Sequence, residues 1–297
     1  MIKIFSAATS LGSYNQGTEL APKAILSNSL EEALKKNNLN YELSGELELF
    51  EATLGDNPKL RYHKALVEYN NQLYKDIVDC SSAQDTILCL GGDHSISIAT
   101  MFASKLRHND TIIVYIDAHP DCNGPDATPT GNIHGMPLAT VLGDAIYSDF
   151  NLPKFTYDEA FLIGIKDADT GEQDYLKQNN IIHITMDEVT EHGIAECLKQ
   201  LRTKIAGRPT HVSLDIDSID MSEAPGTGII NKGGFSFREI SYLCRYLSDE
   251  QIVGIDVVEV NPGRDIDDRT VHLASELAVN LLGGEWSAYN QYLSAKH

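Results

Sequence analysis

Short apolar runs alternate along the chain with longer stretches that have the periodicity of helices. Each run is nearly continuous in apolar residues, which is typical of strands buried on both faces of a parallel sheet. Strands and helices that alternate over this length predict an α/β fold, an open parallel sheet with helices on both faces in three αβα layers. The predicted strands are 86–90, 111–116, 161–165, 181–185, 211–216 and 251–260, and the predicted helices are 62–78, 188–206 and 237–247.

The chain shows no internal boundary. It has no repeat, no low-complexity tract and no linker rich in proline, glycine or serine. With 297 residues, of which 42% are hydrophobic and 22% charged, it can bury a large core without disulfides or a structural metal. We therefore predict a single domain over 1–297, to which the first 60 residues contribute a first strand and helix.

The formal net charge of -20 excludes some classes of partner. It argues against nucleic acid, because a phosphate backbone is met by clustered lysine and arginine. It would attract small cations, although acidic surfaces also simply keep cytosolic proteins soluble. Five widely spaced cysteines without a CxxC pair fit reduced thiols. The start has no basic region before a long apolar one, and no stretch approaches about 18 apolar residues, so we expect a cytoplasmic protein without a membrane span.

Four of the predicted strands lead into clusters of polar residues. These are GGDHS at 91–95, DAHPD at 117–121, DID at 215–217 and the end of DVVEVNP at 256–262. In open α/β sheets, ligands bind in the crevice outside the carboxyl ends of the strands. We therefore expect the four clusters to converge on one crevice.

The spacing within the clusters indicates shared ligands. Residues i and i+2 of a strand share a face, so Asp117 and His119 should point together, as should Asp215 and Asp217. Asp121, just beyond the strand end, can turn back to join them. The candidate metal ligands are His94, Asp117, His119, Asp121, Asp215 and Asp217.

Two imidazoles and four carboxylates without a thiolate suit Mn²⁺, with Mg²⁺, Fe²⁺ or Co²⁺ as alternatives. Six ligands exceed what one open metal site uses and suit a pair of ions about 3.5 Å apart. Two divalent ions and four carboxylates cancel, and a bridging hydroxide then leaves one net negative charge. Such a site complements a cationic substrate better than a phosphate ester. A single Asp at a strand end is more often a helix cap or a loop residue, but the paired patterns favour metal binding.

These motifs, in this order and at this spacing, resemble those of the ureohydrolase family, which includes arginase, agmatinase and their relatives. The resemblance runs from about Thr86 to Gly283, and the first 60 residues match only weakly. It implies two Mn²⁺ ions with Asp117 and Asp215 as bridging ligands. One ion would be held by His94, Asp117, Asp121 and Asp215, and the other by Asp117, His119, Asp215 and Asp217.

The resemblance also implies a mechanism. Hydroxide activated by the metals attacks the guanidinium carbon, and the intermediate collapses to urea and an amine. Asp121 would orient the hydroxide, and Glu259 would pair with the substrate guanidinium. His134 would carry a proton to the leaving amine, although taken alone it reads as a loop histidine.

Within the family, the substrate that the sequence favours is L-arginine, which would be cleaved to L-ornithine and urea. Asn123, Thr130 and Asn132 match contacts to the substrate α-carboxylate, with Thr130 in place of the commoner serine. Asp169 and Glu172 match acidic residues near the α-ammonium. Agmatine has no α-carboxylate, so these matches favour arginase over agmatinase.

Three positions depart from the arginase pattern. Ile229 stands where a threonine usually lines the guanidinium site, Met221 replaces a proline and Lys166 replaces an arginine. Isoleucine keeps the branched shape but removes a hydrogen-bond partner, about 0.5–1.5 kcal/mol of net interaction. Our hypothesis is that Ile229 raises KM or shifts the preference toward another guanidino compound.

Other readings stay open at this point. The chain could be an agmatinase or another guanidino-acid ureohydrolase. An inactive relative that binds metal or a partner would usually have lost a ligand, His134 or Glu259, and all are present. A metallophosphoesterase would need clustered arginine or lysine for phosphate. The family is usually trimeric or hexameric, so the resemblance implies a homo-oligomer.

Overall fold

The computed structural model describes residues 1–13, 15–48, 52, 54, 55 and 57–285. Their strands form one open sheet of eight strands in which all neighbours are parallel, in the order β2-β1-β3-β8-β7-β4-β5-β6. The strands are β1 (Ile2–Ala7), β2 (Tyr41–Leu47), β3 (Thr86–Gly91), β4 (Ile112–Ile116), β5 (Ala160–Ile165), β6 (Ile182–Thr185), β7 (Thr210–Asp215) and β8 (Ile252–Val258).

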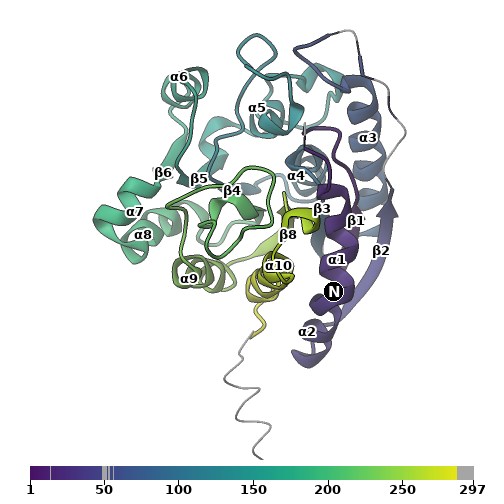
Figure 1. The fold of residues 1–297 in the computed structure, drawn as a ribbon, viewed down its shortest axis with the longest axis vertical. Coiled ribbons are helices and arrows are strands. Elements are labelled where there is room, and N and C mark those ends of the chain that lie inside the picture. The colour runs from purple at the N-terminus through teal and green to yellow at the C-terminus, as the bar shows by residue number, and fades with distance from the viewer. Residues whose placement is uncertain (14, 49–51, 53, 56, 286–297) are drawn as a thin grey trace, which may run out of the picture.

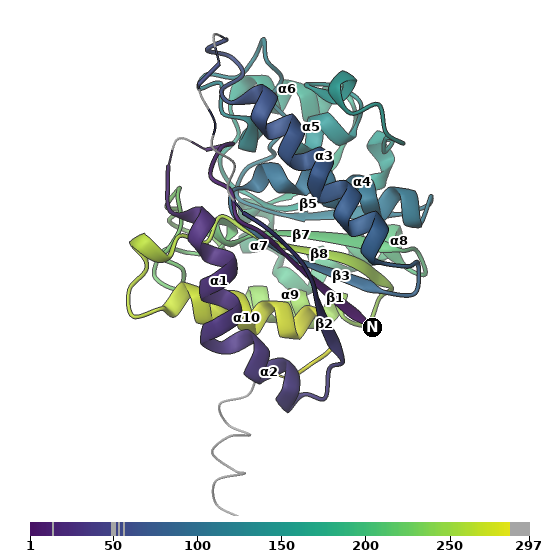
Figure 2. The same ribbon diagram turned by 90° about the vertical axis from the view of Figure 1, so that its right-hand side faces the viewer.

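Helices cover both faces of this sheet (Figure 1). Figure 2 shows α3 (His63–Cys80) and α4 (Ser97–Arg107) on one face, and α1 (Ala21–Ile25), α9 (Phe237–Leu247) and α10 (Arg269–Leu281) on the other. None of the helices in the described part of the chain has the length and apolar character needed to cross a membrane. The remaining α-helices are α2 (Glu31–Lys36), α5 (Pro137–Val141), α6 (Thr170–Gln178), α7 (Met186–His192) and α8 (Ile194–Ile205).

The central strands are buried on both faces, as their sequence predicts. In β4, Ile112, Val114 and Ile116 pack into the core under α9 and α10. Ile113 and Tyr115 of the same strand pack into the core under α4 and α5. Because alternate residues enter two apolar layers, the strand needs an unbroken apolar run. The predicted α/β fold with an open parallel sheet is confirmed.

The predicted helices match observed helical segments to within two residues at their ends, and one of them is interrupted. The helix expected over 188–206 is wrong as a single element, because Gly193, with φ of 78°, separates α7 from α8. The left-handed conformation favours glycine and ends a helix there. The prediction for 237–247 matches α9, which begins with a capping box between Ser236 and Glu239.

The first 60 residues contribute more than one strand and one helix. They supply β1 and β2, which form one edge of the sheet, with β1 paired to β3. They also supply α1 and α2, and α1 packs near α10 on one face. The N-terminal region therefore completes the sheet and one helical layer.

Candidate metal centre and substrate site

The four polar clusters follow four strands that are consecutive neighbours in the sheet. The order β3-β8-β7-β4 places the segments 91–95, 259–261, 215–217 and 117–121 side by side at the carboxyl edge. β8 is the last strand in the described part of the chain, yet it lies between β3 and β7. The predicted convergence of the four clusters at a strand-end crevice therefore depends on the position of β8 between β3 and β7.

The paired ligands are brought together by turns and not by alternation along a strand. β4 ends at Ile116, and the backbone N–H of His119 donates to Asp117 Oδ1 at 2.8 Å. β7 ends at Asp215, and the N–H of Asp217 donates to Asp215 Oδ1 at 2.7 Å. The expectation that both pairs share a strand face is wrong, because each aspartate caps the turn that follows its strand.

One half of the site is centred on His94, which is completely buried. Its Nδ1 atom lies 3.1 Å from Asp117 Oδ2, 3.1 Å from Asp121 Oδ2 and 3.1 Å from Asp215 Oδ2. An imidazole nitrogen carries at most one proton, so it cannot donate to three carboxylates at once. A cation among these four atoms would satisfy all of them.

The other half is centred on His119. Its Nδ1 atom lies 3.1 Å from Asp217 Oδ2 and 3.5 Å from Asp117 Oδ1. The ligand atoms of Asp117, His119 and Asp217 all lie within 4.8 Å of one another, as do those of His94, Asp117 and Asp215. Asp117 belongs to both groups, an arrangement that suits two ions with a shared carboxylate.

The charges in this cluster are not balanced by hydrogen bonds. Burial, together with the charges of Asp121 and Asp217, raises the pKa of Asp117 to about 6. Burial and the same kind of repulsion raise the pKa of Asp215 well above its usual value. Within the described part of the chain, Asp217 Oδ1 is buried without a hydrogen-bond partner, and Asp117 Oδ2 has only the ion-pair approach of His94. The donor set therefore fits hard divalent cations, whose charge would offset this repulsion.

Asp121 reaches the cluster through an unusual backbone conformation. Its φ of 49° lies in the left-handed region and costs a non-glycine residue about 1–3 kcal/mol. This turn confirms the expectation that Asp121 points back toward the strand end. Tyr115, which sequence reasoning missed, donates from its hydroxyl to Asp121 Oδ2 at 3.0 Å and stacks on His94 at 4.6 Å. Its only signal was a tyrosine in an otherwise aliphatic run.

Glu259 and His134 form a pair beside the metal ligands. Glu259, at φ of 63°, accepts the backbone N–H of His94 at 2.9 Å through Oε1. The same oxygen lies 2.9 Å from His134 Nδ1. Burial opposes a charge on His134, but the carboxylates of Glu259, Asp121 and Asp93 outweigh it and raise the pKa of His134 to about 9. This raised pKa favours the protonated imidazole of His134 beside the carboxylate of Glu259.

A hollow of 180 Å³ opens from the candidate metal ligands to the surface. Its floor includes His119, Asp121, Asp215 and Asp217, while His94 and Asp117 lie buried beneath. Of the predicted substrate contacts, only Asp169 does not line it. The walls include Asn123, Thr128, Thr130, Asn132, His134, Glu172, Ile229 and Glu259.

Asp169 and Glu172 also have a structural role. Asp169 is the N-cap of α6 and accepts the N–H of Glu172 at 3.0 Å, while Glu172 Oε2 accepts the N–H of Asp169 at 3.1 Å. This capping box fixes the start of the helix. Asp169 also accepts from Asn123 Nδ2 at 2.9 Å, so it holds a wall residue in place. Burial and the charge of Asp121 raise the pKa of Glu172 to about 8.

Two N-terminal segments support the site, which sequence reasoning did not find. The carbonyl of Gly12 accepts the N–H of His134 at 3.0 Å. Lys59 Nζ donates to the carbonyl of Thr128 at 2.6 Å, and the N–H of Arg61 donates to the carbonyl of Gly131 at 2.9 Å. A Cβ atom at Gly131 would lie 2.0 Å from the carbonyl oxygen of Pro58, so the two segments approach closely only with glycine there.

Of the three departures from the arginase pattern, only Ile229 lines the small hollow. Its neighbour Gly228 is held through its carbonyl, which accepts from Arg264 Nη1 at 2.8 Å and from Asn15 Nδ2 at 3.3 Å. Ile229 is 39% exposed, so an apolar surface faces the site entrance. Met221 and Lys166 do not contribute to this wall.

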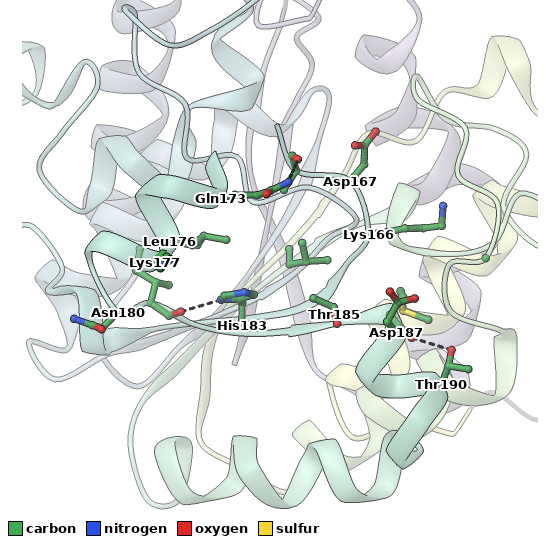
Figure 3. Close-up of a pocket in the computed structure, with 15 residues that line it drawn as sticks. Lys166, Asp167, Gln173, Leu176, Lys177, Asn180, His183, Thr185, Asp187 and Thr190 are labelled. Atoms are coloured by element: carbon green, nitrogen blue, oxygen red, sulfur yellow. Dashed lines mark hydrogen bonds between the residues drawn. The ribbon is translucent and has the colours of Figure 1, made fainter. Parts of the chain in front are cut away.

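A larger hollow of 1070 Å³ lies at the outer edge of the sheet and holds none of the six candidate ligands. Figure 3 shows His183 on the strand between Lys177 of α6 and Asp187 of α7, with Lys166 at one end. Its charged residues are of both signs. The chemistry therefore belongs to the smaller hollow.

Comparison with known proteins gives consistent matches. The model of the arginase family matches residues 1–283. The arginase of Staphylococcus aureus (strain COL) is 32% identical over 292 residues, covering 95% of each chain. The solved structure of the arginase from Bacillus caldovelox is 30% identical with a TM-score of 0.91, covering 96% of this chain and 99% of that one. Proclavaminate amidino hydrolase from Streptomyces clavuligerus is 27% identical with a TM-score of 0.75, covering 95% and 90%.

The matches extend further along the chain than the motifs indicate. The family model begins at residue 1, whereas the sequence resemblance was expected to begin near Thr86. The N-terminal strands and the supporting contacts of Gly12 and Lys59 explain why this region belongs to the same fold. The expectation that the matched stretch begins near Thr86 is therefore wrong, because the match with the family model includes the N-terminal region.

Proposed function

Since the chain belongs to the arginase family of hydrolases, we propose that it cleaves L-arginine to L-ornithine and urea, with two Mn²⁺ ions as cofactors and Fe²⁺ or Co²⁺ as alternatives. One observation carries this proposal. Buried imidazoles and carboxylates form two ligand groups that share Asp117, beneath a hollow walled by Glu259, His134 and Asn123. Such a site can hold two cations and place a guanidinium above them.

We assign the metal ligands from the two halves of the cluster. His94, Asp117, Asp121 and Asp215 would hold one ion, and Asp117, His119, Asp215 and Asp217 the other. Bound there, the ions would supply Lewis acidity and make a water nucleophilic near neutral pH.

The protein side chains then have three tasks. Glu259, whose carboxylate is buried, pairs with the planar guanidinium of the substrate. When water adds to the guanidinium carbon, Asp121 orients the nucleophile. The bond from that carbon to the side-chain nitrogen of the product amine breaks, and that nitrogen needs a proton. His134, protonated beside Glu259, is placed to give it.

The far wall would select the amino-acid end of the substrate. Asn123, Thr130 and Asn132 would bind the α-carboxylate, and Asp169 and Glu172 would face the α-ammonium. The bond from Asn123 to Asp169 links the two halves of this clamp. A second candidate is an agmatinase or another guanidino-acid ureohydrolase. The observation that favours it is Ile229, an apolar residue in the wall.

The test is urea release by the Mn²⁺-loaded protein with L-arginine and agmatine side by side. We expect arginine to have the higher kcat/KM, and Asn123→Ala to raise KM for arginine much more than for agmatine. Agmatine turned over faster, or both substrates affected equally by the variant, would favour the second candidate. No urea from any guanidino compound, with full metal loading, would point to an inactive relative.

We further propose that the protein acts in the cytoplasm as a homo-oligomer, a trimer or hexamer, without a nucleic-acid partner. The five free cysteines fit a reducing compartment. The net charge of -20 favours a cationic small molecule over a polyanion.

A further inference from the structure

A row of buried polar side chains lies behind His94, on the side away from the carboxylates. His94 Nε2 is 2.9 Å from Ser213 Oγ, which lies 3.5 Å from Asp256 Oδ2. The same carboxylate oxygen accepts from Thr100 Oγ1 at 2.7 Å and from His211 Nε2 at 3.0 Å. All five residues are buried, with exposures of at most 2%. They form one connected network that reaches a candidate metal ligand.

The network is built across two central strands and one helix. Ser213 and His211 lie on β7, and Asp256 lies opposite Ser213 on β8. Thr100 reaches down from α4. A Cβ atom at Gly254 would lie 2.5 Å from His211 Nδ1, so the imidazole fits only because this β8 position is glycine. The backbone is therefore arranged around the imidazole.

Asp256 determines the direction of the hydrogen bonds. Burial opposes its ionisation, but the charge and the hydrogen bond of His211 hold the pKa of Asp256 below its usual value. A carboxylate only accepts, so Ser213 turns its hydroxyl proton toward Asp256 or the neighbouring Ser97. The Ser213 oxygen then accepts from His94 Nε2, which must carry the proton. His94 Nδ1 is left with a lone pair, on the side of Asp117, Asp121 and Asp215.

Stability does not account for this arrangement. Burying a carboxylate is costly, and Asp256 Oδ1 is buried without a hydrogen-bond partner among the residues that the structure describes. Well-packed apolar residues in place of such a buried pair are often as stable or more so. The network does, however, orient one ligand of the metal site, as outer hydrogen bonds do in other metalloproteins.

We propose that Asp256 is a positioning residue which, through Ser213, holds His94 in the tautomer and ring orientation that bind a metal ion. This inference rests on the metal centre of the proposed function. His94 belongs to one half of that centre, and His119 of the other half contacts Asp117 and Asp217 instead. Loss of the network should therefore weaken the binding of one ion and leave the binding of the other unchanged.

The experiment measures Mn²⁺ binding to the metal-free protein by equilibrium dialysis and by electron paramagnetic resonance, without substrate. Removing an outer hydrogen bond costs roughly 10- to 100-fold in metal affinity. We expect Ser213→Ala and Asp256→Asn each to lower the affinity for one of the two ions by about tenfold. This is the low end of the range because Asp256 acts through a second residue. The spectrum should change from a coupled pair to a single ion at limiting Mn²⁺.

A double variant separates positioning from general destabilisation. If Asp256 acts through Ser213, Asp256→Asn should add little to the effect of Ser213→Ala, whereas independent effects would multiply. Thr140→Val is the matched control, because this hydroxyl is equally buried and has no hydrogen-bond partner among the described residues. It should leave both affinities unchanged.

Three results would overturn the inference: equal weakening of both ions, multiplicative effects in the double variant, or unchanged binding in Ser213→Ala. Ser213→Ala removes one oxygen atom, so it keeps the test decisive if Asp256→Asn does not fold. Failure of the parent protein to bind two ions would instead refute the proposed metal centre. The two failures are thus distinguishable.

Discussion

Replacing Ile229 by threonine tests whether one side chain in the wall tunes substrate binding. Ile229 lines the 180 Å³ hollow together with Glu259, and its neighbour Gly228 is fixed by Arg264 and Asn15. The backbone should therefore stay in place when the side chain changes. Threonine keeps the branch at Cβ and exchanges a hydrocarbon for a hydroxyl.

The expected change in substrate binding follows from one added hydrogen bond. A net gain of about 0.5–1.5 kcal/mol corresponds to roughly two- to twelvefold in an equilibrium constant. Because the wall contacts the substrate before and during the reaction alike, the gain should lower KM for arginine and leave kcat nearly unchanged. Because Ile229 is 39% exposed, we expect the change in KM to lie in the lower half of this range.

The assay is initial-rate urea release over a range of arginine and agmatine concentrations. Ile230→Thr is the matched control, because Ile230 is adjacent and 51% exposed but does not line the hollow. The reasoning fails if Ile229→Thr leaves both KM and the substrate preference unchanged, or if Ile230→Thr has the same effect. A fall in kcat alone would also contradict it.

Three further predictions concern stability and metal binding. Burial raises the pKa of Glu276 to about 7, and the charge of Arg245 offsets this only partly. The ionised carboxylate therefore destabilises the fold above pH 7, and this destabilisation fades as the pH falls toward about 4.5, the ordinary pKa of a glutamate. Glu276→Gln should raise the free energy of unfolding by about 1 kcal/mol at pH 8, a value reduced because the side chain is partly exposed, and should leave it unchanged at pH 4. Urea unfolding measures both values, and an equal gain at the two pH values would contradict this prediction. Leu243→Ala, fully buried on α9, should cost about 2–5 kcal/mol in the same assay, and a loss below about 1 kcal/mol would be inconsistent with its burial. Removal of metal by a chelator should lower Tm, and adding Mn²⁺ at about 100 times its Kd should restore roughly 2.7 kcal/mol of the free energy of unfolding. An unchanged Tm would argue against a metal site.

Much of the fold can be predicted from local patterns. The apolar runs of β3 to β8 identify the buried strands, because a strand covered on both faces has no polar side. The position of α9 follows from its apolar periodicity and from the cap between Ser236 and Glu239. The acidic and histidine clusters at 117–121 and 215–217 identify candidate ligands, because such groups rarely end buried strands together.

Other features depend on contacts between distant segments. No local pattern places β8 between β3 and β7, since strand order is decided by how the helices cross over and pack. The break at Gly193 depends on a backbone angle, and alternation alone predicted a shared strand face for Asp215 and Asp217 where a turn brings them together.

The amino-acid sequence by itself determined the buried strands β3 to β8 and the candidate metal ligands, because these properties belong to single residues and their near neighbours. Only the tertiary structure decided that Tyr115 and Ser213 contact His94, that Asp256 lies behind Ser213, and that Gly12 and Lys59 hold His134 and Thr128 in the wall. These contacts join residues far apart in the chain, and their partners are fixed by the packing of the whole sheet rather than by any local preference.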